Sequence, residues 1–280
     1  MKLCFNQATT MCNSTLEKEL ELCEQNGYDL IEIRLDKLRE YLETKTISDL
    51  AGFFKKSRIK PFAFNALEWI NFRTPEDWET LMSGLDLFCE VGKEIMCDTV
   101  VIVPTPDVGN KTLSEIKASS LEAIKAIDAR CKKNNWPMKL AFEFVGYPNL
   151  CVNTFGQAYD IVESVNMENV GIVLDCFHFH AMGSRFKDLE RAALEKLLIL
   201  HVDDSEDLPV GAARDEHRLW PGDGAVKLDR IFKILKDKGY EKMASVELFR
   251  PEYYELSAED TIRIGKEKSI GVLSKFWEVG

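Results

Sequence analysis

The chain has 280 residues, a length that suits one large α/β barrel or two domains of average size. Hydrophobic residues make up 45% of it and charged residues 30%, which is typical of a soluble globular protein with a sizeable core. The 36 basic and 47 acidic residues give a formal net charge of −11, which argues against a nucleic acid or an anionic membrane surface as the partner. No apolar stretch approaches the roughly 18 residues that a membrane span requires.

The first ten residues and the cysteines both bear on the cellular compartment. In MKLCFNQATT the apolar run is broken at Asn6 and Gln7, so this segment does not resemble a signal peptide. The eight cysteines include no CxxC pair, which argues against thiolate zinc sites and thioredoxin-type redox chemistry. We therefore expect free thiols in a reducing cytoplasm.

Taken in chain order, short apolar runs alternate with amphipathic stretches long enough for helices. This alternation is typical of strand–helix units, and the runs are too far apart for hairpins. The eight predicted strands are residues 2–5, 30–34, 61–65, 99–103, 139–145, 170–175, 197–202 and 244–248. They predict a single (β/α)8 TIM barrel over residues 1–280, with the active site at the C-terminal ends of the strands. The alternative, an open doubly wound sheet, normally has a glycine-rich first turn, and residues 4–14 contain no glycine.

Helix-start signals lie between these predicted strands, where strand–helix units need them. Ser14 and Glu17 have the spacing of a capping box, and Gly27 is placed to end the helix that follows. Thr74 followed by Pro75 is typical of an N-cap and a first helical position. No Gly/Ser-rich or Pro-rich linker interrupts the pattern, so the sequence predicts no domain boundary.

Four successive strands in the second half each carry a residue that can bind metal near the C-terminal end. These residues are Glu143, Asp175, His201 and Glu247. An ionised group in apolar surroundings must find a partner, so a buried ion pair is the alternative for any one of them. Their repetition at equivalent heights instead favours one divalent cation, and three carboxylates with one imidazole suit Zn, Mn, Mg or Co.

Two kinds of residue near these strands are candidates for contact with a substrate. Glu143 and Glu247 come from different sides of the predicted barrel mouth, and we expect them to flank a substrate and to act as general bases. His178 follows Asp175 by three residues and is predicted to contact the substrate or the metal, with a role as the alternative base. The opposing interpretation of His178 is a surface loop histidine.

The segment after the seventh strand, residues 201–224, is long for a loop and is therefore expected to be functional. Arg218 is the cation in it best placed to hold anionic or polarised oxygens of a substrate. Its alternative is a solvated arginine paired with Asp215 or Asp223. Trp220 is a candidate for the pocket wall, and an anchor for the loop is the alternative that the sequence leaves open.

The first half of the chain offers weaker signals. Glu32 and Arg34 alternate with apolar residues and share one face of the second predicted strand, so we expect a structural ion pair inside the barrel. Asn65 ends the third predicted strand and is a candidate donor to a substrate hydroxyl.

Segments along the whole chain resemble the xylose-isomerase-like TIM-barrel superfamily, which includes sugar isomerases, sugar epimerases and endonuclease IV. Within it, the chain is more similar to the inosose isomerases of bacterial inositol catabolism. The segments that carry the resemblance are KLCFNQATT, YDLIEIRLDKL, FEFVGYPNLCVNTFGQAYDIV, VLDCFHFHAMGS, HVDDSEDLPVG, RLWPGDGA and SVELFRPEYY. Carried over by residue, the family's metal ligands fall on the same four residues, and its substrate contacts fall on His178 and Arg218.

The resemblance implies an isomerase that interconverts 2-keto-myo-inositol and 1-keto-D-chiro-inositol through an enediolate. Ketose 3-epimerase and hydroxypyruvate isomerase activities on the same metal site are the alternatives, followed by a non-catalytic polyol-binding protein. Epimerases of the superfamily carry a glutamate where this chain has Asn149, which disfavours the epimerase. Nuclease activity is rejected because the chain has four histidines, none before His178, and Arg218 stands where the nuclease has a ligand histidine. The expected partner is a small cyclic polyol or ketose, and the sequence does not decide between a monomer and a homo-oligomer.

Overall fold

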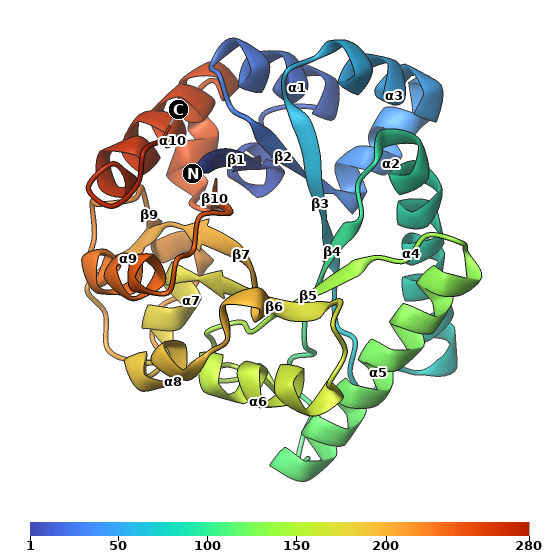
Figure 1. Cartoon of the computed structure of the whole chain (residues 1–280), viewed down its shortest axis with the longest axis vertical. Coiled ribbons are helices and arrows are strands. Elements are labelled where there is room, and N and C mark those ends of the chain that lie inside the picture. The colour runs from blue at the N-terminus through green and yellow to red at the C-terminus, as the bar shows by residue number, and fades with distance from the viewer. Residues whose placement is uncertain (280) are drawn as a thin grey trace.

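The computed structural model describes residues 1–279 and contains a closed barrel of eight parallel strands (Figure 1). Each strand pairs with its neighbour in sequence, and the last pairs with the first, which closes the barrel. The predicted TIM barrel is confirmed. Its strands are β1 (Lys2–Asn6), β2 (Leu30–Arg34), β3 (Lys60–Leu67), β4 (Thr99–Ile102), β5 (Lys139–Glu143), β6 (Val170–Asp175), β7 (Leu197–Val202) and β10 (Met243–Val246).

Helices form a ring around these strands and cover their outer faces (Figure 1). Large apolar side chains from the strands and helices fill the space between the two layers, as the fold requires. The helices are α1 (Leu16–Gln25), α2 (Leu35–Thr44), α3 (Ile47–Lys56), α4 (Pro75–Ile95), α5 (Leu113–Lys133), α6 (Phe155–Val165), α7 (Cys176–Ala181), α8 (Phe186–Arg191), α9 (Leu228–Asp237) and α10 (Ala258–Leu273). Short 3-10 turns are η1 (Gln7–Thr10), η2 (Leu194–Lys196), η3 (Asp215–His217) and η4 (Pro251–Glu255).

The helix caps agree with the sequence in part. Thr74 caps α4 with Pro75 at its first position, as predicted. The expectation for Ser14 is wrong, because Thr15 is the N-cap of α1 and its hydroxyl accepts from the backbone of Lys18. The strand–helix pattern predicts one helix between β2 and β3, but the segment forms two helices, α2 and α3, since a capping box at Thr46 starts a new helix.

The interior of the barrel is layered by the two-residue period of the strands. One apolar layer consists of small and branched side chains, including Cys4, Ala63, Ala141, Val173 and Ile199. Two positions further along the same strands, the inward-facing residues are polar. These are Asn6, Glu32, Asn65, Glu143, Asp175 and His201, and Glu247 follows β10 directly. The polar layer therefore lies at the C-terminal ends of the strands.

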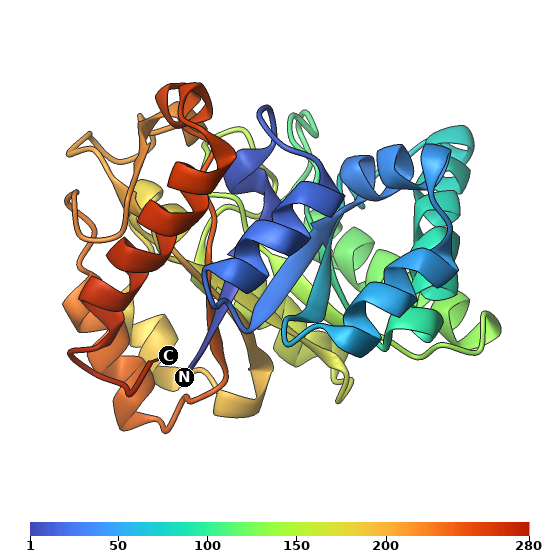
Figure 2. The same ribbon diagram turned by 90° about the horizontal axis from the view of Figure 1, so that it is seen from above.

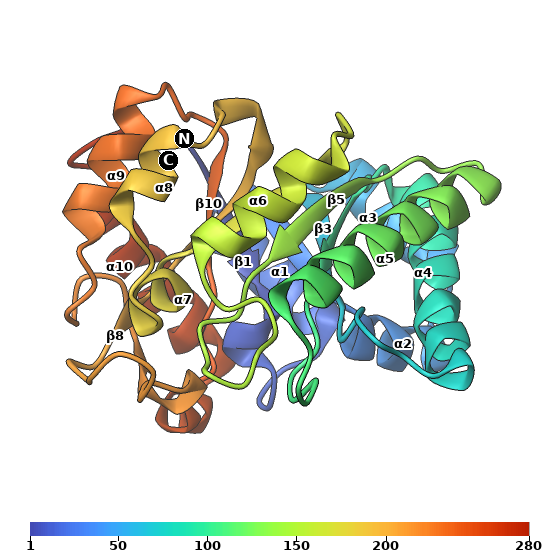
Figure 3. The same ribbon diagram turned by 90° about the horizontal axis from the view of Figure 1, so that it is seen from below.

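Long connections rise from that same end of the barrel, and the two ends of the described chain lie at the opposite end (Figures 2 and 3). The connection after β7 contains a two-stranded antiparallel sheet of β8 (Asp204–Ser205) and β9 (Arg218–Leu219) that sequence analysis did not predict. None of the helices described combines the length and apolar content that crossing a bilayer requires.

Candidate active site

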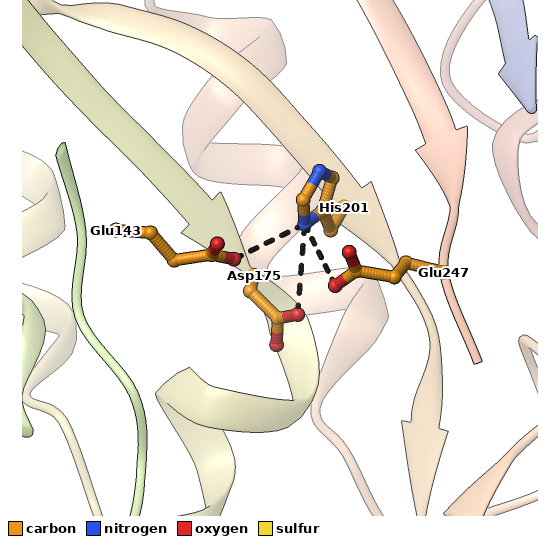
Figure 4. A group of neighbouring side chains, drawn as sticks. All are labelled: Glu143, Asp175, His201 and Glu247. Carbon is orange, nitrogen blue, oxygen red and sulfur yellow. Dashed lines mark ion pairs between the residues drawn. The ribbon is translucent and has the colours of Figure 1, made fainter. Parts of the chain in front are cut away.

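The four predicted metal-binding residues converge at the C-terminal end of the barrel (Figure 4). Glu143 and Asp175 are the last residues of β5 and β6, His201 is the penultimate residue of β7, and Glu247 follows β10. One candidate ligand atom from each residue lies within 4.8 Å of the others, and all four side chains are buried. We call these four residues the ligand cluster.

The imidazole of His201 lies at the centre of the ligand cluster (Figure 4). Its Nδ1 is 3.2 Å from Oε1 of Glu143, 3.7 Å from Oδ2 of Asp175 and 3.1 Å from Oε2 of Glu247. Nδ1 and Oε1 of Glu143 are both buried without a hydrogen-bond partner. Three carboxylates and an imidazole nitrogen that face one another with no hydrogen bond between them are the donor set of a divalent cation, so the residues fit a metal.

Glu32 contacts the other nitrogen of the same imidazole. Nε2 of His201 is 3.2 and 3.3 Å from the two carboxylate oxygens of Glu32. Because a carboxylate accepts a hydrogen bond, Nε2 carries the proton, and Nδ1 then directs its lone pair towards the ligand cluster. The predicted ion pair of Glu32 with Arg34 is wrong, since Arg34 is the last residue of its strand and binds Asp36 at 3.0 Å, whereas Glu32 binds His201.

The electrostatics of the ligand cluster show how much positive charge it needs. Burial and the nearby carboxylate of Glu247 raise the pKa of Glu143 to about 8. Burial lowers the pKa of His201, but the carboxylates of Glu247 and Glu32 raise it well above the ordinary value of a histidine. The carboxylates thus stabilise positive charge at the nitrogens of His201, and a metal ion beside Nδ1 would supply such a charge.

Glu32→Gln is expected to weaken metal binding by about 10–100-fold, because a neutral amide polarises the imidazole less than a carboxylate does. The affinity can be measured by competition with a chromogenic chelator. Glu19→Gln is the matched control, since Glu19 is equally buried but binds Lys37 and Thr10 instead. The control should lower the melting temperature without changing the metal affinity. Equal affinities of Glu32→Gln and the wild type would contradict this role for Glu32.

Arg218 is buried against the ligand cluster and is not a solvated loop residue. Its Nη1 donates to Oδ2 of Asp175 at 2.9 Å and to Asp203, and its Nε donates to Asp215 at 2.9 Å. The alternative partner Asp223 instead binds Lys268. The guanidinium therefore adds a positive charge that compensates the buried carboxylates around it.

His178 lies in α7 and is also buried. Its Nε2 is 3.0 Å from Nη2 of Arg218, and because a guanidinium only donates, Nε2 accepts and Nδ1 carries the proton. That Nδ1 is buried without a partner, beside the ring of Tyr147. Burial lowers the pKa of His178, which favours the neutral imidazole. His178 thus offers a free donor, the arrangement expected of a contact with a substrate oxygen.

The loop that carries Arg218 is held in place by Asp204 and Trp220. The carboxylate of Asp204 accepts from the backbone of Gly222 and Val226, and a side chain at Gly224 would overlap it. The indole of Trp220 stacks on Tyr253 at 4.4 Å between ring centroids. These contacts are those of a loop anchor, the alternative that the sequence left open for Trp220, and its contact with a substrate stays a prediction.

Two residues that contact the ligand cluster or Arg218, Asn6 and Asp203, were not identified from the sequence. Asn6 and Asn65 donate to Glu247, and Asp203 binds Arg218. Asn65 was expected to donate to a substrate, but its amide faces a protein carboxylate. A signal was present for each of them, because a polar residue at an inward position of an apolar strand needs a partner.

Comparison with known proteins places this geometry in a family. The model of the xylose isomerase-like TIM barrel family matches residues 20–268. The inosose isomerase of Halalkalibacterium halodurans is 50% identical over 276 residues, which cover 98% of this chain and 97% of that protein. The inosose isomerase of Bacillus subtilis is 46% identical over 280 residues, the full length of both. The chain therefore belongs to the xylose isomerase-like TIM barrel family and, within it, to the inosose isomerases.

A solved structure agrees with this assignment. The crystal structure of the IolI protein with a bound zinc atom is 46% identical to this chain, with a TM-score of 0.95. The match covers 99% of this chain and 100% of that one. The family relationship confirms the expectation of an isomerase, and the bound zinc together with the ligand cluster supports a divalent metal.

Proposed function

We propose that the protein is a metal-dependent isomerase that interconverts 2-keto-myo-inositol and 1-keto-D-chiro-inositol. The observation that carries the proposal is the geometry of the ligand cluster. Nδ1 of His201 has no hydrogen-bond partner, and it lies 3.2 Å from a carboxylate oxygen of Glu143 and 3.1 Å from one of Glu247. A site with a cation and two flanking carboxylates suits the transfer of a proton between adjacent carbons of a hydroxyketone. Identity of 46–50% to inosose isomerases supports the substrate.

Glu143, Asp175, His201 and Glu247 would hold one divalent cation, with Zn, Mn, Mg and Co all suited to three oxygens and one nitrogen. When bound, such a cation acts as a Lewis acid that stabilises negative charge on the substrate oxygens.

The residues of the chain supply the remaining chemistry. The carboxylates of Glu143 and Glu247 lie on two sides of the ligand cluster and are the candidate bases for the proton on carbon. His178 would donate from Nδ1 to a substrate oxygen, and Arg218 keeps His178 in the tautomer that allows this. Arg218 adds positive charge beside the same oxygens. Trp220 would close the site from the loop.

The epimerase alternative receives no support from Asn149. Its side chain is exposed and donates to Asp107 at 3.1 Å, so it offers no third carboxylate to the site.

All eight cysteines lie among the described residues and none forms a disulfide, which supports a reducing cytoplasm as the location.

Proton NMR in D2O with the purified protein and added Mn(II) or Zn(II) tests the proposed function. We expect interconversion of the two inososes, with exchange of the hydrogen on the carbon next to the ketone. Free ketoses serve as the comparison, and turnover of a ketose with no turnover of either inosose would overturn the proposal. Added chelator should stop the reaction, and restored metal should restart it.

A further inference from the structure

The two glutamates of the ligand cluster have different surroundings. Nδ2 of Asn6 donates to Oε1 of Glu247 at 2.7 Å, and Nδ2 of Asn65 donates to the same oxygen at 3.3 Å. Both asparagines are buried. The orientation of the Asn6 amide is fixed, because its Oδ1 accepts from the backbone of Ala8 at 2.9 Å and caps η1. Its NH2 group must therefore face Glu247.

Glu143 receives no comparable support. No donor within residues 1–279 forms a hydrogen bond to its carboxylate: its Oε1 lies 3.2 Å from Nδ1 of His201 and is buried without a hydrogen-bond partner. The strand positions explain the difference, since Asn6 ends β1 and Asn65 lies near the end of β3, whereas Glu143 on β5 lies beside the apolar residues of β4. Within the described chain, the fold thus provides hydrogen-bond donors to Glu247 and provides none to Glu143.

Both oxygens of Glu247 are committed to other groups. Oε1 accepts two amide N–H groups, and Oε2 lies 3.1 Å from Nδ1 of His201 and 3.6 Å from Nη1 of Arg218. A proton arriving from a substrate carbon would have to displace one of these partners. Glu143 can accept it without losing a hydrogen bond.

We propose that Asn6 and Asn65 are positioning residues that fix Glu247 as a ligand through Oε2, and that Glu143 alone carries the substrate proton in both directions. This assignment rests on the proposed function. It predicts that one carboxylate removes the proton from one carbon and returns it to the next on the same face of the ring.

The step balances without an oxidant or a reductant. Glu143 takes the proton from the carbon that bears the hydroxyl, and the C–H electron pair becomes the carbon–carbon double bond while the carbonyl π pair moves to its oxygen. Return of the proton to the former carbonyl carbon consumes that double bond. The hydroxyl proton of the first carbon moves to the oxygen of the second, so that a new carbonyl forms at the first.

The positioning role can be tested without catalysis. Asn6→Ser removes the amide but keeps an oxygen that can cap η1, and Asn65→Ser is the second variant should the first not fold. In the Co(II)-loaded proteins we expect the visible absorption to fall as Glu247 turns and binds through both oxygens, and the Co(II) affinity to drop by about 10–100-fold. Asn71→Ser is the matched control, since Asn71 is equally buried and binds Ser120. A wild-type spectrum and affinity in both site variants would overturn the positioning role.

The proton assignment is tested by hydrogen exchange in D2O with metal-saturated Glu143→Gln and Glu247→Gln. We expect Glu143→Gln to slow exchange at the carbon by about 10²–10⁴-fold, and Glu247→Gln to exchange measurably once loaded. Wild-type protein in H2O should pass part of a carbon-bound deuterium from one carbon to the next. Equal loss of exchange in the two variants, or exchange that survives in Glu143→Gln, would overturn the assignment and leave the proposed function intact. Failure of the wild type to turn over either inosose would overturn the proposed function itself.

Discussion

Arg218→Met is expected to lower the free energy of unfolding by about 3–5 kcal/mol, because it leaves buried carboxylates without their cation. The guanidinium binds Asp175, Asp203 and Asp215, and methionine keeps only the apolar contacts with Phe177 and Phe249. We also expect kcat/KM to fall by the equivalent of about 2–4 kcal/mol, with the metal retained. Chemical denaturation, kinetics and elemental analysis measure the three quantities.

The matched control is Arg230→Met. Arg230 also stacks on an aromatic ring, that of Phe186, but it is exposed and its pair with Glu190 spans 3.9 Å. Its substitution should cost less than about 1 kcal/mol. If Arg218→Met cost no more than this control, the guanidinium would not be the compensating charge of the site.

Saturation with a divalent metal is expected to stabilise the protein by about 4 kcal/mol when the free metal exceeds the dissociation constant a thousandfold. For a chain of this length, each kcal/mol of added stability raises the melting temperature by about 2–4 °C. Glu143→Ala should shrink the rise, because one ligand is lost. It should also leave the metal-free protein at least as stable as the wild type, because a buried carboxylate without hydrogen-bond partners is removed.

Differential scanning calorimetry with Mn(II), Zn(II) and a chelator measures both effects. Glu163→Ala is the control, since Glu163 pairs with Arg191 on the exposed face of α6, and it should keep the full metal-induced rise. A rise that is equally large in Glu143→Ala would show that the stabilising ion binds elsewhere.

The barrel could be predicted because its strands are strongly apolar and separated by helix-length segments. The predicted strand ends differ from the observed ones by up to two residues, as at β5, which ends at Glu143 rather than at Val145. The sheet of β8 and β9 could not be predicted, since two-residue strands have no periodicity. It pairs Ser205 with Arg218, and the carboxylate of Asp204 holds the chain just after β9 by accepting from the backbone of Gly222.

The ligand cluster was predictable because each member is an ionisable side chain at the end of an apolar strand. The contacts that Glu32 and Asn6 make with the ligand cluster could not be predicted, because the partners are far apart along the chain. Glu32 and His201 are 169 residues apart, and Asn6 and Glu247 are 241 apart. Their contacts follow from strand stagger and barrel closure, which fix which inward positions share a layer. Local alternation placed Glu32 inside correctly but assigned it the wrong partner.

The residues of the ligand cluster all come from the second half of the barrel, on strands β5, β6 and β7 and after β10, whereas Glu32, Asn6 and Asn65 come from the first three strands. The proposed ligands and the residues that contact them therefore lie in separate stretches of the gene. Under the proposed roles, substitutions before residue 70 would alter metal affinity and the hold on Glu247 without replacing any residue of the ligand cluster. The presence of these four residues in another protein of this architecture would therefore not by itself establish a common reaction.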